Sequence, residues 1–299
     1  MNKIGYLWMI VVALLLAGCQ KVDLGDEPGK GEKPDKTKPV TLTVAQFESI
    51  AFPSTTETCA ALADVATHID FAVFDAAGTK VAKKNEKAGD DDYGTASFML
   101  GEGTYAVVII AHNGTGSATI SSTEKASFPN NKMTDTFTYY GTLTVGADGA
   151  QQSVTLRRVV AVVRFMLLDD KLPTNLDHIR FYYTGGSSTL NPSTGLGAKN
   201  SRQEELRTVA QAAKDADGHY YFDLYTIPKA ADGNTLKLTV QGIDAAGNTI
   251  KEQVFSAVPV TVNTIMLYKG TFFTGSASAA SAITLTADAE WGATNSYNY

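Results

Sequence analysis

The sequence contains little cysteine and little charge. Cys19 and Cys59 are the two cysteines among 299 residues, and only 19% of the residues are charged. If Cys19 is modified, as argued below, no disulfide can form within the chain, so its stability must come from packing and backbone pairing. We interpret Cys59 as a small buried hydrophobe rather than a nucleophile. The net charge is −6 and no basic stripe occurs, which argues against nucleic acid as a partner.

Motifs of known catalytic sites are missing as well. The sequence has no G-x-S-x-G, H-E-x-x-H, P-loop or G-x-G-x-x-G motif. Its four histidines are scattered, and no two have the i, i+4 spacing of a helical zinc site: His68, His112, His178 and His219. We therefore predict that the protein is not an enzyme and binds neither a metal nor a cofactor.

Two acidic stretches could offer oxygen ligands to calcium. They are Asp90-Asp91-Asp92 and the stretch with Asp215, Asp217 and Gly218. Neither has the spaced acceptors of a known calcium loop. We interpret both stretches as solvated turns.

No apolar run reaches the roughly 20 residues of a transmembrane helix. The run Ile4–Leu16 follows Lys3 and ends in Leu16-Ala17-Gly18-Cys19. A positive start, a short apolar core and a cleavage site of small residues define a secretory signal. The sequence therefore predicts a signal peptide that is cut between Gly18 and Cys19.

The cysteine at this cut matches a bacterial lipobox, in which the thiol receives a diacylglyceryl group. We predict that residues 1–18 are removed and that acylated Cys19 becomes the new N-terminus. The acyl chains would then hold the protein on a membrane. An ordinary signal peptide followed by a chance cysteine is the alternative.

Residues 19–39 are predicted to be a flexible tether. The stretch QKVDLGDEPGKGEKPDKTKP mixes Lys with Asp and Glu and is rich in Pro and Gly. It has too little apolar content to offset the entropy of ordering. The tether would hold the folded part away from the bilayer.

From Val40 onward, short strands with period-two alternation dominate. Turn signals separate them, among them Asp75-Ala-Ala-Gly-Thr, Asp148-Gly149 and Asp244-Ala-Ala-Gly-Asn. The continuous apolar run YAVVIIA predicts a central strand that is buried on both faces. Residues 153–169 look like one long strand. Only residues 201–215, SRQEELRTVAQAAKD, predict a helix.

About a dozen short strands favour an all-β fold of β-sandwich architecture. We place a domain boundary near residue 152, with an N-terminal domain over 40–152 and a C-terminal domain over 153–299. Tyrosines cluster in or near the strands, where they could stack on sugars or pack half inward. The clusters lie at 139–140, 182–183, 220–221 and 297–299. Together with Trp291 they leave a glycan-binding surface lipoprotein as an alternative function.

Three segments resemble a known family. They are GEGTYAVVIIAHNG at 101–114, VTLRRVVAVVRF at 154–165 and VNTIMLYKGTFF at 262–273. Together with the lipobox and the tether, they are similar to the fimbrial lipoproteins of Bacteroidales, the fimbrillin-type pilins and FimB-like anchor subunits. The resemblance covers essentially the whole chain. It implies two transthyretin-like β-sandwich domains in tandem after a lipidated flexible tether.

The resemblance also implies a function, a location and partners. Such proteins are structural subunits of a fimbrium, made as lipoproteins of the outer membrane and exposed at the cell surface. In shaft pilins, a protease that is typically arginine-specific removes the lipidated N-terminus and the first strand. A strand of a neighbouring subunit then fills the groove by donor-strand β-augmentation. Anchor subunits keep their lipid and hold the fibre at the membrane.

The arginines help to distinguish these roles. The chain has six, and the first of them is Arg157. No arginine-specific cut can therefore release the predicted first strand, VTLTVAQF at 40–47, although tether lysines could serve another protease. We predict an anchor or assembly-regulating subunit, with a shaft or tip pilin as the alternative. The strand-like AITLTADAEW near the C-terminus could complete its own domain or be donated to a neighbour.

Overall fold

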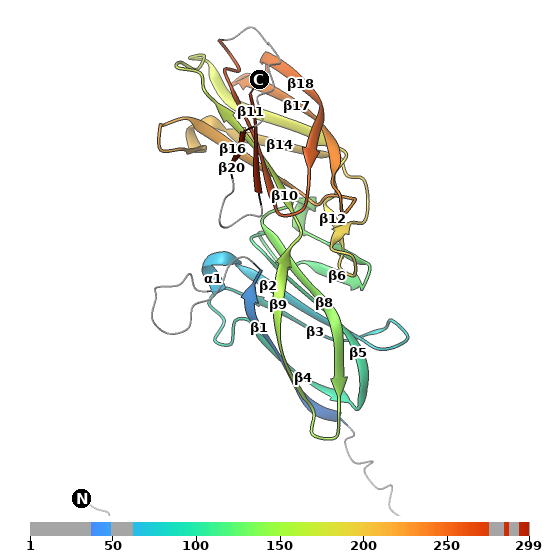
Figure 1. Cartoon of the computed structure of the whole chain (residues 1–299). Coiled ribbons are helices and arrows are strands. Elements are labelled where there is room, and N and C mark those ends of the chain that lie inside the picture. Colours follow the sequence, from blue (N-terminus) through green and yellow to red (C-terminus); the bar gives the residue numbers. More distant parts are fainter. Residues whose placement is uncertain (1–36, 49–61, 275–283, 287–292, 299) are drawn as a thin grey trace, which may run out of the picture. The chain divides into compact units, whose positions relative to one another are not determined.

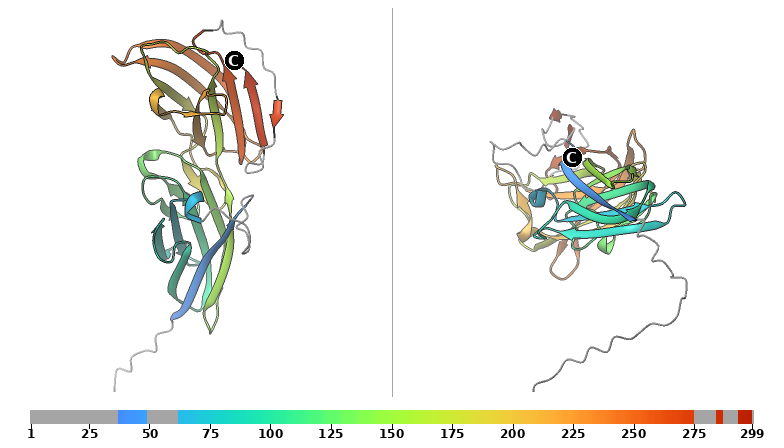
Figure 2. Two further views of the ribbon diagram at one scale, coloured as in Figure 1. Left: turned by 90° about the vertical axis from the view of Figure 1, so that its left-hand side faces the viewer. Right: turned by 90° about the horizontal axis from the view of Figure 1, so that it is seen from below.

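A computed structural model describes residues 37–48, 62–274, 284–286 and 293–298. Strands make up most of these residues, and the longest helix is α1 (Leu62–Val65). The all-β prediction is therefore confirmed. Within the described residues, no helix is long and apolar enough to cross a membrane. Figure 1 shows the strands coloured by their order in the sequence, and Figure 2 gives two further views.

Seven strands of the N-terminal part form one sheet, in the order β3-β2-β5-β8-β9-β1-β4. Their bounds are β1 (Thr37–Phe47), β2 (His68–Phe74), β3 (Lys80–Lys87), β4 (Thr95–Gly101), β5 (Gly103–His112), β8 (Thr136–Val145) and β9 (Ala150–Arg158). Buried residues from both ends of the strand order share one hydrophobic core, including Leu42, Phe71 and Ala96. The run YAVVIIA lies in β5, whose last six residues are all buried between β2 and β8. This central strand was predicted correctly.

Two sheets of the C-terminal part enclose a second core. One has the order β15-β16-β10-β19-β21-β20 and the other β14-β11-β17-β18. The bounds of the first are β10 (Ala161–Leu167), β15 (Ala213–Lys214), β16 (Tyr220–Thr226), β19 (Thr264–Gly270), β20 (Thr284–Thr286) and β21 (Ala293–Asn298). Those of the second are β11 (Leu176–Thr184), β14 (Gln203–Thr208), β17 (Asn234–Asp244) and β18 (Thr249–Val260). Phe165 and Phe181 face each other from the two sheets, with their ring centroids 5.8 Å apart.

A fourth sheet, made of short strands, joins segments from both sides of residue 152. It has the order β13-β12-β7-β6, and β7 pairs with β12. The bounds are β6 (Thr119–Ser122), β7 (Lys125–Ser127), β12 (Thr189–Asn191) and β13 (Leu196–Gly197). Phe74, Val160 and Leu190 are buried in one core beside this sheet. The predicted boundary at 152 lies inside β9, which belongs to the seven-stranded sheet, and the division into two domains remains a prediction.

Residues 153–169 do not form one strand, as the sequence suggested. Strand β9 ends at Arg158 and β10 begins at Ala161, and the two strands belong to different sheets. Val159 and Val160 between them are both buried. The residues between the two strands are as apolar as the strands themselves because they are also buried in a core. The composition of the segment therefore does not reveal where β9 ends and β10 begins.

The helix predicted over 201–215 is wrong. Residues Gln203–Thr208 form strand β14, paired antiparallel with β11, and only a 3₁₀ turn, η2 (Val209–Gln211), follows. Along β14, Gln203 and Glu205 are buried while Glu204 and Leu206 are exposed. This alternation has the period of a strand, and pairing with β11 overrides the helix propensity of Glu, Leu and Arg.

The predicted hairpin turns are present. Asp75 begins the turn between β2 and β3, and Asp244 begins the turn between β17 and β18. In each turn, Oδ1 of the aspartate accepts hydrogen bonds from the backbone N–H groups two and four residues later. The turn at Asp148 and Gly149 joins β8 to β9. Gly149 has a φ of 91°, and an added Cβ would lie 2.1 Å from the carbonyl oxygen of Pro39. Both the turn and the close approach of β1 therefore require glycine there.

Candidate functional site

Strand β1 is built into the interior of the seven-stranded sheet. It pairs antiparallel with β4 over Thr37–Thr43 and parallel with β9 over Val40–Phe47. The left view of Figure 2 shows β1 running alongside β9. Val40, Leu42 and Val44 alternate into the core, and Phe47 is also buried after a register shift between Val44 and Gln46. Because β1 is hydrogen-bonded on both sides, its removal would leave an open groove between β4 and β9.

The two later segments of the family resemblance meet at Arg158. Its guanidinium donates to both carboxylate oxygens of Asp135 at 2.8 and 2.9 Å. It also donates to Oδ1 of Asn263 at 3.2 Å and lies over the ring of Phe137, 4.7 Å from its centroid. Asn263 has a φ of 57° and donates its backbone N–H to the carbonyl of Val160. The arginine therefore connects the end of β9 to the start of β19.

Replacing Arg158 should be far more costly than replacing its neighbour. The Arg158 side chain is 3% exposed, and Arg158→Met leaves the Asp135 carboxylate, which is 18% exposed, without its cation. Breaking one side of such a pair costs about 3–5 kcal/mol in the free energy of unfolding. Arg157→Met is the matched control, since Arg157 is exposed in the same strand. Urea unfolding of both variants measures the difference, and equal effects would contradict the role of Arg158.

Two histidines that are distant in sequence stack on each other. His68 and His112 are cross-strand partners, and their ring centroids are 5.5 Å apart. His112 is fully buried, with its Nε2 3.3 Å from Oδ2 of the buried Asp70. Asp70 also accepts hydrogen bonds from Asn85 and from the N–H of Ala118. The scattered sequence positions hid this cluster, which only the register of β2 against β5 could reveal.

Burial and the neighbouring His112 lower the pKa of His68, whereas Asp70 acts in the opposite direction and Lys87 adds to the lowering. The unfolded chain therefore binds a proton at a higher pH than the folded chain. The free energy of unfolding should fall as the pH drops below about 6.5, and stop falling once the folded imidazole is protonated. His68→Gln should flatten this part of the stability profile. An unchanged slope in urea unfolding from pH 5 to 8 would contradict the prediction.

The acidic stretches behave as turns. Asp215 accepts hydrogen bonds from the N–H groups of Asp217 and His219, the pattern also found at Asp75 and Asp244. The ligand atoms of Asp215, Asp217 and His219 lie within 4.8 Å of one another, and Nδ1 of His219 is 3.1 Å from Oδ2 of Asp215. In the other stretch, Asp90 accepts from the N–H of Lys87, and the Asp92 carboxylate pairs with Lys84 at 2.6 Å.

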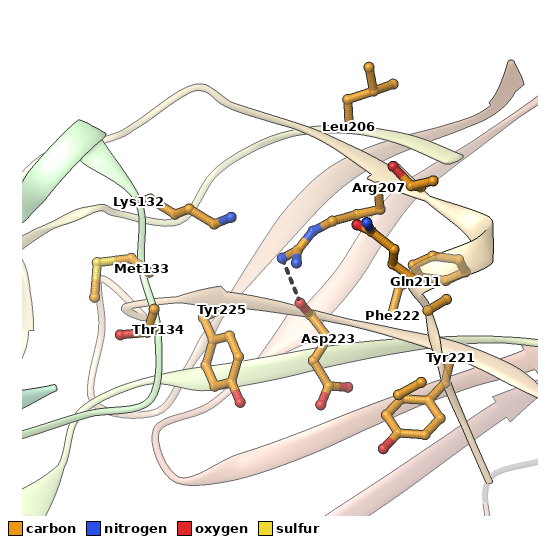
Figure 3. Close-up of a pocket in the computed structure, with 13 residues that line it drawn as sticks. Lys132, Met133, Thr134, Leu206, Arg207, Gln211, Tyr221, Phe222, Asp223 and Tyr225 are labelled. Carbon is orange, nitrogen blue, oxygen red and sulfur yellow. Dashed lines mark hydrogen bonds between the residues drawn. The ribbon is translucent and has the colours of Figure 1, made fainter. Parts of the chain in front are cut away.

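A cavity of about 620 Å³ lies between β14, η2, β16 and residues 132–134 (Figure 3). Its residues are Lys132, Met133, Thr134, Leu206, Arg207, Thr208, Gln211, Ala212, Ala213, Tyr221, Phe222, Asp223 and Tyr225. Sequence reasoning singled out Tyr221 through its pair with Tyr220, but not the cavity. Strand β14 supplies much of one wall, and this segment had been predicted as a helix.

The tyrosines of the predicted clusters differ in burial. Tyr183 is buried and donates to the carboxylate of Glu205, whereas Tyr182 and Tyr140 are 36% and 43% exposed. Strand β21, which contains Tyr297, pairs parallel with β19. In this structure the last strand therefore belongs to a C-terminal sheet of the same chain.

The predicted acylation site and its cleavage position, Cys19 and Gly18, lie outside the described residues, as do Cys59 and Trp291.

Residues 33–270 match the family model of the fimbrillin-A associated anchor proteins Mfa1 and Mfa2. The chain belongs to this family. It is therefore a fimbrial, adhesin-like subunit, as the resemblance predicted. No curated protein matches the chain.

Several solved structures are similar to the chain. A candidate adhesin from Bacteroides ovatus is 14% identical, with a TM-score of 0.49 over 75% of this chain and 83% of that one. The fimbrial anchor protein Mfa2 from Porphyromonas gingivalis is 13% identical, with a TM-score of 0.39 over 73% and 82%. The tip fimbrial protein Mfa3 from the same organism is 11% identical, with a TM-score of 0.37 over 76% and 92%.

Proposed function

We propose that the protein is the lipid-anchored subunit that fixes a fimbrium to the outer membrane. Its membership of the anchor family supports a role in the fimbrium. In this proposal acylated Cys19 stays on the mature chain, a neighbouring subunit is bound by β-strand addition at a site other than the groove that β1 fills, and no enzymatic step is involved.

The observation that carries this proposal is the position of β1 relative to basic residues. Between Lys38 and Lys80 the sequence contains neither lysine nor arginine. A protease specific for either residue can therefore cut before or at the start of β1, but not between β1 and β2. Since β1 supplies four buried core side chains, the seven-stranded sheet keeps its own first strand. A subunit whose groove is already filled by its own β1 cannot accept a donor strand in that groove. Such a subunit would therefore lie at the end of a fibre.

The mature N-terminus tests the proposal. Mass spectrometry of protein from the cell surface should find a chain that begins with acylated Cys19. A mature chain that begins between residues 48 and 62 would overturn the proposal and favour a shaft subunit. Treating the purified protein with arginine-specific and lysine-specific proteases provides a control, since β1 should remain with the folded part in both digests.

A further inference from the structure

The cavity of Figure 3 combines cations and aromatic rings on an acidic protein. Lys132 and Arg207 reach it from different segments of the chain. The carboxylate of Glu205 is 7% exposed; it pairs with Arg207 and lies 3.9 Å from the ammonium of Lys132. One carboxylate is thus shared between two cations.

The second carboxylate at the cavity is already neutralised. Asp223 accepts two hydrogen bonds from Arg164, both at 2.7 Å, and this pairing raises the pKa of Arg164. Arg164 also lies over the ring of Tyr221, 4.4 Å from its centroid. The cations Lys132, Arg164 and Arg207 therefore outnumber the carboxylates of Glu205 and Asp223. This local excess of positive charge favours an anionic ligand, although the whole chain has a net charge of −6.

Arg207 has a donor that no described residue satisfies. Its Nε is buried and without a hydrogen-bond partner, while the terminal nitrogen Nη2 contacts Glu205 and, at 3.4 Å, the backbone carbonyl of Asp223. A buried donor left unpaired is costly, and such groups are normally satisfied by a partner. The Arg207 side chain as a whole is 35% exposed, so the outer edge of its guanidinium is open to a ligand that brings its own acceptor.

The remaining lining suits a hydroxylated ligand. The rings of Tyr221 and Tyr225 line the cavity, although Arg164 covers one face of Tyr221, and the Gln211 amide can bind hydroxyls. Burial raises the pKa of Tyr225, so its hydroxyl stays protonated and able to donate. The volume of about 620 Å³ falls within the range of about 300–1,000 Å³ that is typical of small-molecule sites.

From these features we infer that the cavity binds a carboxylate-bearing sugar, such as a terminal uronic or sialic acid residue of a glycan. Arg207 and Lys132 hold the carboxylate, the tyrosine rings pack against the apolar face of the sugar, and the neutral polar groups bind its hydroxyls. This function goes beyond anchoring and does not depend on it. The protein would contact acidic glycans at the surface on which it is displayed.

Matched ligands test the inference on the full mature protein. Methyl glucuronide and methyl glucoside differ only at C6, which is a carboxylate in the first and a hydroxymethyl group in the second, and a methyl sialoside and acetate complete the set. Calorimetric or NMR titration should show that at least one acidic glycoside binds about 10-fold or more tightly than the glucoside and than acetate. The inference is overturned if neither acidic glycoside binds, or if acetate binds as tightly as they do.

Variants locate the binding. Arg207→Met and Lys132→Met should each weaken acidic-glycoside binding by about 10-fold, and Lys132 is 51% exposed, so its replacement leaves the fold intact. Arg180→Met is the matched control, because Arg180 pairs with Glu204 on the neighbouring strand outside the cavity. Equal losses in Arg180→Met and Arg207→Met, together with unchanged binding in Lys132→Met, would place the sugar elsewhere and overturn the assignment.

Discussion

Replacing Cys19 with alanine should move the protein from the membrane fraction to the culture medium. Acyl chains contribute about 0.8 kcal/mol per buried methylene, and two or more chains hold a protein on a bilayer stably. Without them, the predicted tether has no apolar segment that could take their place. Fractionation and immunoblotting measure the shift, and we expect most of the protein outside the membrane fraction.

Loss of the lipid should also release the fimbrium from the cell. If this subunit fixes a fimbrium to the cell, Cys19→Ala cells should shed intact filaments into the medium, where electron microscopy and sedimentation can count them. Gln20→Ala is the matched control, because it alters the adjacent residue and keeps the thiol. Filaments that stay on Cys19→Ala cells would contradict the anchoring role, and cells that form no filaments would instead point to a shaft subunit.

Placing a charge in β1 should have the largest effect on stability. Leu42 is fully buried and sits between its partners Ala96 on β4 and Gln152 on β9. Leu42→Asp removes a large apolar side chain and places a carboxylate in the core, which together cost more than about 4 kcal/mol. This is a large part of the stability of about 5–15 kcal/mol that a folded protein has. The N-terminal core should therefore unfold or melt at a much lower temperature.

Gln46→Asp provides the control for this experiment, since Gln46 is exposed in the same strand and its replacement should change stability by less than about 0.5 kcal/mol. A peptide with the sequence of Thr37–Phe47 adds a second measurement. If Leu42→Asp only empties the groove, the peptide should bind and restore the melting temperature. Similar melting temperatures for Leu42→Asp and the unaltered protein would show that β1 does not support this core.

The fold class could be predicted because local signals agreed with the tertiary structure. The turns at Asp75 and Asp244 are determined by side-chain hydrogen bonds within five residues, so they can be recognised without the rest of the chain. The central strand β5 is apolar along most of its length, as its burial between two strands demands.

The errors arose where distant partners decide the structure. Residues 203–208 form a strand because β11 pairs with them, and nothing nearby in the sequence encodes that partner. Val159 and Val160 separate two strands, yet both are as apolar as a strand interior because each enters a core. The cavity was missed for the same reason, since its walls combine residues 132–134 with β14 and β16.

The placement of β1 also has a mechanical consequence. Strand β1 is the first described strand of the chain, so the residues that carry the predicted lipid join the folded part at its first residue, Thr37. In the proposed anchor, tension from the membrane would therefore be applied at the first residue of β1 and would pull along this strand. Its ladders to β4 and β9 would be loaded in shear, so many hydrogen bonds must break together rather than one after another. A strand held in this way resists sudden pulling by a high barrier to forced unfolding, which is a kinetic property distinct from equilibrium stability.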